Sequence, residues 1–213
     1  NCHTICRCAQ ILYHVTDREV WQDYLHTASE LTKKAPAEGL VSVIIPSKDN
    51  PQVLKKCLDS LEGLTGIEVI VVDNGSSEEN RKAIEKIVGD GKYLYHPMPF
   101  NFSEMCNLGA REATGRYLLF LNDDIEAHGT TWLDKMKEKT SQNYVGAVGL
   151  KLYYPQSQKI QHAGITNLPV GPVHKLQFAE DDKSYYFNRN KGAWNCMAVT
   201  GACLLIEAEK YKE

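Results

Sequence analysis

No stretch of this 213-residue chain is long and apolar enough to cross a bilayer, which takes roughly 20 consecutive apolar residues. Residues 1–10 are polar and rich in cysteine, so they lack the apolar centre of a secretory signal peptide. Neither sign of charge is in excess, because 24 Lys and Arg face 27 Asp and Glu, for a net charge of −3. This balance excludes the basic footprint of a protein that binds nucleic acid.

Cysteine is present, but not in a metal-binding pattern. The seven cysteines include no Cys-x-x-Cys pair, which excludes the standard zinc motifs. Four of them lie among apolar neighbours, as reduced and buried thiols do: Cys57, Cys106, Cys196 and Cys203. An odd count without a secretion signal favours a reducing compartment, so the sequence predicts a cytoplasmic protein.

Several signatures of nucleotide binding and catalysis are also missing. No G-x-G-x-x-G follows the first predicted strand, and no G-x-x-x-x-G-K-[ST] occurs anywhere. There is no G-x-S-x-G nucleophile motif, and residues 122–128 lack the glycine and spacing of a calcium loop. Without a glycine-rich cradle, a metal ion is the more natural way for this chain to hold a diphosphate.

From residue 40 onward, apolar β-branched runs alternate with amphipathic segments. Strands are predicted at residues 41–45, 67–72, 93–95 and 117–121. Helices are predicted at residues 51–61, 77–88, 103–113 and 130–139. We expect Pro46 to end the first strand, and Ser76 with Glu79 to form a capping box for the second helix. The alternation predicts an α/β fold with a mostly parallel sheet and helices on both faces.

The alternation weakens toward the end of the chain. A strand is expected around residues 145–152, another at 160–165, and a third at 198–206. Residues 166–192 are polar and contain prolines, and they are predicted to form one long loop. The sequence ends at residue 213 within a last predicted helix, which Glu207 and Glu209 are expected to start.

Polar residues follow three of the predicted buried strands, at residues 46–49, 73–76 and 122–124. Ligands of open α/β sheets bind beyond the carboxyl ends of the strands, so these residues should meet at one site. Asp123 and Asp124 repel each other there, and a hard divalent cation would relieve that repulsion. A capping turn before the next helix is the simpler alternative for these two residues. Asp73 begins an Asp-Asn-Gly turn and could also accept a hydrogen bond from a nucleotide base.

Together these segments resemble glycosyltransferase family 2, of the GT-A fold. The resemblance extends over residues 40–213 and is carried by residues 41–50, 70–77, 100–109, 115–125, 161–164 and 199–205. The last two, Gln-His-Ala-Gly and Val-Thr-Gly-Ala-Cys-Leu-Leu, are similar to the branch that builds rhamnose-rich and other bacterial cell-surface polysaccharides. The resemblance implies inverting transfer of a sugar from a UDP-, dTDP- or GDP-linked donor to a saccharide or lipid-linked acceptor.

The resemblance also implies roles for particular residues. Asp73 would contact the base, Asp123 would lie by the ribose or the donor sugar, and Asp124 would bind Mg²⁺ or Mn²⁺. Asn122 takes the first position of the Asp-x-Asp metal motif, where it is a weaker ligand. The other expected nucleotide-sugar contacts are Pro46, Ser47, Asp49, Asn101 and Asn107.

A later histidine can serve as an additional metal ligand in this fold, which makes His162 and His174 candidates. The alternative for both is a hydrogen-bonded structural histidine. The family's general base is expected beyond Glu213, so the chain is interpreted as a fragment without it. Residues 1–35 resemble the closing segment of a preceding domain. A lipid-linked acceptor would bring the protein to the inner face of the membrane.

Two other functions remain open at this point. A module that binds a nucleotide sugar without turnover would have the same donor site and no general base. A sugar-phosphate nucleotidyltransferase would share a related fold, but it normally opens with a glycine- and arginine-rich loop, which residues 46–49 are not.

Overall fold

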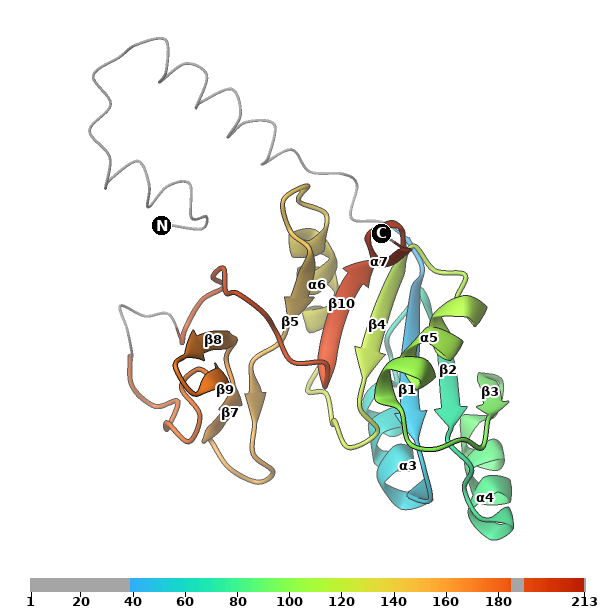
Figure 1. Ribbon diagram of the computed structural model, residues 1–213. Coiled ribbons are helices and arrows are strands. Elements are labelled where there is room, and N and C mark those ends of the chain that lie inside the picture. Colours follow the sequence, from blue (N-terminus) through green and yellow to red (C-terminus); the bar gives the residue numbers. More distant parts are fainter. Residues whose placement is uncertain (1–38, 185–189, 213) are drawn as a thin grey trace, which may run out of the picture. The chain divides into compact units, whose positions relative to one another are not determined.

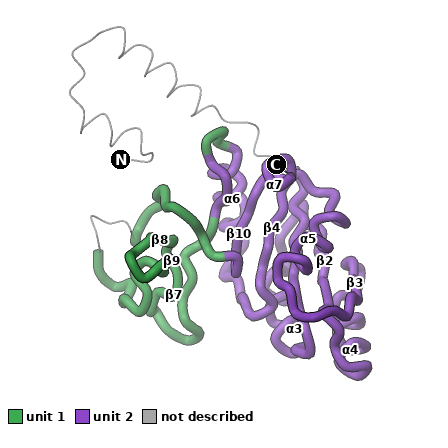
Figure 2. Tube along the Cα trace, viewed as in Figure 1, with its two compact units in different colours: residues 1–35, 142–144, 149–200 green, residues 36–141, 145–148, 201–213 purple. Residues whose placement is uncertain are grey.

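The computed structural model describes residues 39–184 and 190–212, so the expected preceding domain at residues 1–35 lies outside the described residues. The chain divides into two compact units (Figure 2). Of the described residues, unit 2 comprises 39–141, 145–148 and 201–212, and unit 1 comprises 142–144, 149–184 and 190–200. None of the helices in the described ranges is long and apolar enough to cross a membrane.

Unit 2 is built on a six-stranded sheet of order β3-β2-β1-β4-β10-β5 (Figure 1). Its strands are β1 (Val41–Ser47), β2 (Ile67–Asp73), β3 (Lys92–Tyr95), β4 (Tyr117–Leu121), β5 (Ala147–Gly149) and β10 (Cys203–Glu207). Its helices are α3 (Pro51–Ser60), α4 (Glu78–Val88), α5 (Phe102–Glu112), α6 (Thr131–Thr140) and α7 (Ala208–Lys212). The strands β3, β2, β1 and β4 run parallel, and β10 is antiparallel to β4. This confirms the predicted α/β class.

The central strands are buried on both faces, as parallel strands between helices must be. Ile44 of β1 and Phe120 of β4 pack with Met105 of α5 in one apolar cluster. Side chains alternate along a strand, so the neighbours Ile45 and Leu119 point to the opposite face, where they are also fully buried. Helices therefore cover both faces, as the sequence predicts.

Helix α5 approaches the sheet unusually closely at Gly109. A Cβ at this position would lie 2.3 Å from Cγ2 of Ile44, nearer than two carbon atoms can approach. Glycine thus allows α5 to pack directly on β1, which is why a glycine is tolerated within the helix.

Two predicted boundaries in unit 2 are wrong. Pro46 does not end β1, which continues to Ser47. Because β1 pairs with β4 only as far as Ile44, no strand on that side requires a hydrogen bond from the N–H that Pro46 lacks. Ser76 does not cap α4: the Ser77 hydroxyl accepts the capping hydrogen bond from the Asn80 N–H at 3.4 Å. The N-cap therefore lies one residue later than predicted, and its bond goes to Asn80 rather than involving Glu79.

Unit 1 contains short antiparallel ribbons where the sequence predicted one strand and a long loop. The expected strand at residues 145–152 is split between β5 and β6, which belong to different sheets. The expected loop at residues 166–192 contains a hairpin. The ribbons of this unit are β6 (Leu152–Tyr153) with β7 (Ile160–His162), and β8 (Ile165–Leu168) with β9 (Gly171–His174). The last predicted strand is shorter than expected, since β10 begins only at Cys203.

A hydrogen-bonded carboxylate holds part of unit 1 together. The Asp181 side chain is only 9% exposed, and it accepts hydrogen bonds from Lys151 Nζ at 2.5 Å and Tyr153 Oη at 2.6 Å. Asn190 Nδ2 donates to the other carboxylate oxygen at 2.8 Å. Burial alone would raise the pKa of Asp181, but these donors outweigh it and hold that pKa well below its usual range.

Candidate functional site

The carboxyl ends of β1, β2 and β4 meet at one edge of the sheet. Ser47 and Asp73 are register partners, and the Asn74 N–H donates to the Ser47 carbonyl at 3.0 Å. The Ser47 hydroxyl donates to Oδ2 of Asp123 at 2.7 Å. The expectation that these strand ends gather is therefore confirmed. We call the group formed by Ser47, Asp73, Asp123 and Asp124 the strand-end cluster.

The paired carboxylates of β4 have different surroundings. Asp123 is partly buried and accepts the Ser47 hydrogen bond, whereas Asp124 is exposed. Burial raises the pKa of Asp123, the Ser47 hydroxyl opposes that effect, and the charge of Asp124 raises the pKa further. A cation at this point would relieve the repulsion that the two charges exert on each other.

The donor set fits a hard divalent ion that retains open positions. Mg²⁺ and Mn²⁺ are commonly bound by one or two carboxylates, with substrate phosphates and water completing the shell. Asp124 could supply such a carboxylate, and Asn122, two residues earlier in the chain, could supply an amide oxygen. Within residues 39–184 and 190–212, no three His, Cys, Asp or Glu side chains group closely enough to bind a metal unaided. The cluster therefore fits a metal that shares its shell with a ligand.

Asp73 is fully buried, and both of its carboxylate oxygens accept hydrogen bonds. The N–H of Ser76, three residues further on, donates to Oδ1 at 2.8 Å, so the Asp73 side chain closes the Asp-Asn-Gly turn. Tyr93 Oη donates to Oδ2 at 2.5 Å. Burial and the neighbouring Asp73 charge both raise the pKa of Tyr93, so this phenol stays protonated as a donor. The carboxylate is thus fixed in orientation at the end of β2.

Asn74 is the one residue of this edge with an unpaired buried side chain. It is 1% exposed, and neither Oδ1 nor Nδ2 has a hydrogen-bond partner among the described residues. A buried amide without partners is costly, and such groups mark a place where water or a ligand binds. The sequence does not single out Asn74, since an unpaired side chain cannot be recognised from residue type alone.

Asp49 connects the β1–α3 loop to the start of α4. It adopts a φ of 54°, its N–H donates to Ser76 Oγ at 2.7 Å, and its Oδ1 accepts from the Ser77 N–H at 2.8 Å. Asn80 Nδ2 donates to the same Oδ1 at 3.0 Å. Hydrogen bonds from Asn80 and Ser77 lower the pKa of Asp49, so the carboxylate is charged and held. Its visible role is to fix two loops of the site.

Pro46 is buried within β1, next to Ser47. Asn101 and Asn107, also expected to contact the nucleotide, make structural hydrogen bonds. Asn101 is the N-cap of α5, where its Oδ1 accepts from the Glu104 N–H at 3.1 Å. Asn107 Oδ1 accepts from Tyr211 Oη at 2.6 Å, which ties α5 to α7.

The two candidate histidines form a pair within unit 1. His162 is 1% exposed, and its Nε2 accepts from the Gly164 and Thr200 N–H groups at 3.2 and 3.3 Å. The proton of the neutral ring must then be on Nδ1, which donates to Nδ1 of His174 at 2.7 Å. Burial lowers the pKa of His162 to about 4, and the repulsion that a protonated His174 would exert adds to this effect. Both nitrogens of His162 are occupied, which is the arrangement of a structural histidine.

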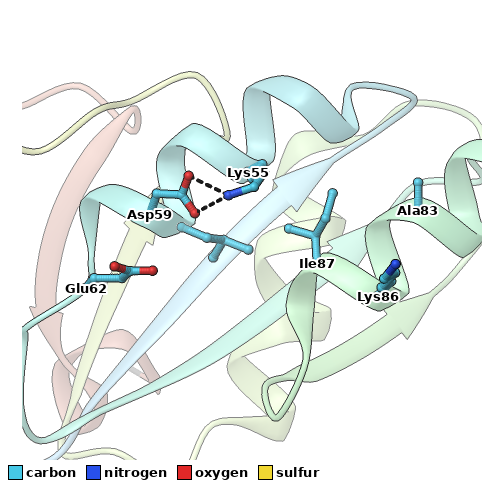
Figure 3. A pocket seen from close by; sticks show the side chains of 7 residues that line it. Lys55, Asp59, Glu62, Ala83, Lys86 and Ile87 are labelled. Atoms are coloured by element: carbon cyan, nitrogen blue, oxygen red, sulfur yellow. Dashed lines mark hydrogen bonds and ion pairs between the residues drawn. The ribbon is translucent and has the colours of Figure 1, made fainter.

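A hollow on unit 2 lies between α3 and α4 (Figure 3). Lys55 and Asp59 form an ion pair at 2.7 Å across one turn of α3. The rest of the lining consists of Leu58, Glu62, Ala83, Lys86 and Ile87. None of the residues expected at the nucleotide site lines this hollow.

Tyr93, Ser76 and Asn80 hold the site together. Ser76 was expected at this edge as a helix cap, and the other two were missed by sequence reasoning. Tyr93 lies in a correctly predicted strand, but only the register of β3 against β2 shows that its hydroxyl reaches Asp73. Asn80 appeared as an ordinary helix residue. No sequence signal distinguishes it.

A mostly parallel sheet with a hydrogen-bonded acidic cluster at its carboxyl edge defines an α/β protein with a candidate ligand site at that edge. The family model described as glycosyl transferase family 2 matches residues 42–213. The chain therefore belongs to glycosyl transferase family 2.

Among individual proteins, the chain is 38% identical over 185 residues to the uncharacterized protein y4gI of Sinorhizobium fredii, covering 82% of this chain and 20% of that protein. It is 32% identical over 189 residues to the O-antigen biosynthesis protein RfbC of Myxococcus xanthus, covering 81% and 14%. The chain thus spans a fifth or less of these relatives.

Solved structures are more distant. The mannosyltransferase PcManGT of Pyrobaculum calidifontis, in complex with GDP-Man and Mn²⁺, is 21% identical with a TM-score of 0.49, covering 62% of this chain and 43% of that one. S. aureus TarS is 22% identical with a TM-score of 0.43, covering 56% and 24%.

Proposed function

We propose that the strand-end cluster binds the donor of a glycosyl transfer reaction, a nucleoside-diphosphate sugar, together with Mg²⁺ or Mn²⁺. The observation that carries this proposal is the arrangement of Asp123 and Asp124. One carboxylate is fixed by the Ser47 hydroxyl at 2.7 Å, and the other is exposed beside it at the carboxyl edge of the sheet. Membership of glycosyl transferase family 2 supports the reaction class.

The residues of the edge would divide the work between them. Asp124 and Asn122 would hold the ion, and Asp123 would face the ribose or the donor sugar. The ion would neutralise the charge that builds up on the departing diphosphate. Asp73 and the unpaired amide of Asn74 would lie at the base, in the pocket bounded by Pro46 and Ser47. Asp49 would keep the loops around that pocket in place.

We further propose that transfer inverts the sugar and that the acceptor is a saccharide or a lipid-linked saccharide of the cell surface. The name of the RfbC relative refers to O-antigen biosynthesis, which is consistent with such an acceptor. Inversion requires a general base for the acceptor hydroxyl. We assign no residue of this chain to that role, and His162 and His174 are left out of the ion's ligand set because they bond to each other.

Calorimetric titration of UDP, dTDP and GDP tests the donor site, with and without Mn²⁺. We expect one of the three to bind, and to bind only with the ion. Asp124→Ala should weaken that binding at least about tenfold, since losing even an indirect partner of a metal ligand costs about 10–100-fold.

The matched control is Asp134→Ala, which removes a carboxylate from α6. The Asp134 side chain is 78% exposed. It should bind the nucleotide as the parent protein does. Metal-independent binding, or equal losses in both variants, would contradict the proposed site.

A further inference from the structure

The backbone of unit 1 is strained at residues 176–178, next to an exposed aromatic side chain. Leu176 and Phe178 adopt φ angles of 55° and 66°, in the left-handed region that glycine normally occupies. Phe178 is 64% exposed, so burial of its ring does not offset the strain. Strain of this kind persists only where the surroundings impose it, and it is concentrated at sites that bind or react.

Backbone hydrogen bonds impose the strained shape. The Phe178 N–H donates to the Ile160 carbonyl at 2.8 Å, and the Ile160 N–H donates to the Ala179 carbonyl at 2.9 Å. The Ala179 N–H closes the turn on the Leu176 carbonyl at 3.0 Å. These bonds fasten the backbone at Phe178 and Ala179 to Ile160 of β7, so the point from which the ring projects is fixed.

A second aromatic ring supports the exposed one. Tyr154 stacks on Phe178 with a centroid separation of 5.3 Å and an interplanar angle of 3°. Gln177 Nε2 donates to Tyr154 Oη at 3.0 Å, which fixes the supporting ring. We call Tyr154 and Phe178 the aromatic platform.

The surroundings of the platform are polar. Gln177 and Glu180 are exposed next to Phe178 in the chain, and Glu180 pairs with Lys159 at 3.7 Å. A protein partner normally buries a broad apolar surface with a polar rim. A single flat ring with amide, carboxylate and ammonium groups around it instead suits a ligand with one small apolar face and many hydroxyls.

We propose that the aromatic platform binds a pyranose ring of the acceptor saccharide. The C–H groups on one face of a pyranose form an apolar patch that packs on an aromatic ring, and its hydroxyls bond to polar neighbours. The inference rests on the proposed function, because it names a site in unit 1 for the acceptor of that reaction. A rigid, pre-formed ring lowers the ordering cost of binding a flexible saccharide.

Saturation-transfer NMR with a mixture of the methyl glycosides of rhamnose, glucose, galactose and N-acetylgalactosamine tests the platform. We expect saturation of the ring protons of at least one glycoside. Phe178→Gly should reduce that signal at least about fivefold. No transfer to any glycoside, or equal transfer in Phe178→Gly, would overturn the inference.

Two further variants separate binding from folding. Phe178→Ala removes the same ring but keeps a Cβ in the strained conformation, so it should bind no glycoside and melt about 2–4 °C below Phe178→Gly. Phe100→Gly removes a ring that is 76% exposed in unit 2, and it should retain the glycoside signal. Loss of signal in Phe100→Gly as large as in Phe178→Gly would refute a specific platform.

Calorimetry on the same samples distinguishes this inference from the proposed function. Phe178→Gly should bind its nucleotide and Mn²⁺ as the parent chain does. If the parent binds nucleotide but Phe178→Gly keeps the glycoside signal, only the platform is wrong. If the parent binds no nucleotide, the donor site itself fails.

Discussion

The two units of this chain are stabilised in different ways. Unit 2 rests on apolar strands buried between helices, with Val43, Ile45 and Leu119 all fully buried. Unit 1 has only two-stranded ribbons among its described residues, and polar side chains do much of the fastening, notably Asp181 and the His162–His174 pair. The proposed donor site lies on unit 2, and the aromatic platform lies on unit 1.

The stability of the two units should therefore respond to different changes in conditions and sequence. Apolar burial does not depend on the ionisation of side chains, so unit 2 should tolerate pH changes and respond to changes of volume. Ion pairs and neutral histidines depend directly on protonation. Unit 1 should therefore respond to pH and to the loss of single polar groups.

The largest expected effect comes from adding volume where α5 meets the sheet. Gly109→Val would bring a branched side chain onto Ile44, where even a Cβ would lie at 2.3 Å. We expect a loss of at least about 3 kcal/mol in the free energy of unfolding, because overpacking a rigid core moves backbone. Hydrogen exchange should accelerate at β1 and α5 but not at β7. Slower or unchanged exchange at β1 would show that the packing is looser than described.

Removing the carboxylate at the centre of unit 1 is the next largest change. Asp181→Ala leaves Lys151 and Tyr153 without their shared acceptor, and we expect a loss of about 3 kcal/mol within unit 1. Exchange should accelerate at the amides of residues 158–162, while β1 remains protected. Asp182→Ala, an exposed neighbour, is the matched control. Equal effects of the two variants would contradict a structural role for Asp181.

Acid should weaken unit 1 through His162. Its pKa is about 4 in the folded chain, against 6.5 for an unperturbed histidine, so below pH 6.5 the unfolded chain binds the proton more readily. Folding stability should fall by about 2 kcal/mol between pH 7 and pH 5. Asp181 adds nothing in that range, because its lowered pKa makes its contribution disappear only at more acidic pH. His162→Gln should flatten the slope, and a parent protein without any slope would contradict a buried, neutral His162.

The smallest effect on stability is expected at Asn74. Asn74→Ala removes two buried polar atoms that have no partner in the described part of the chain. The free energy of unfolding should change by less than about 1 kcal/mol, since no intramolecular hydrogen bond is lost. Nucleotide affinity should still fall about tenfold if the amide contacts the base. A tenfold change corresponds to about 1.4 kcal/mol, which is roughly the contribution of one hydrogen bond. A loss of about 2 kcal/mol or more in unfolding free energy, measured in urea, would instead indicate a structural amide.

The sequence predicted unit 2 better than unit 1, for a physical reason. Buried parallel strands appear as continuous apolar runs, so β1, β2 and β4 were found within one or two residues. The exception at Pro46 depends on how far β4 pairs with β1, which is tertiary information.

The strands of unit 1 could not be predicted from apolar runs. Its ribbons are two to four residues long, and their pairing is set by contacts such as Lys151 with Asp181, 30 residues apart. Periodicity does not report contacts of that kind. For the candidate site, strand ends predicted which side chains meet, but not that Tyr93 and Ser76 would already occupy both oxygens of Asp73.

Direct measurement of Mn²⁺ binding is the sharpest test of the proposed metal site at Asp124. Mn²⁺ would be titrated into the protein with the nucleotide that binds it, and free ion would be followed by electron paramagnetic resonance. Asp124→Asn and Glu126→Gln are compared, since both remove an exposed carboxylate from the same loop. We predict one bound Mn²⁺ per chain, lost in Asp124→Asn and retained in Glu126→Gln. Undiminished Mn²⁺ binding by Asp124→Asn would contradict the account.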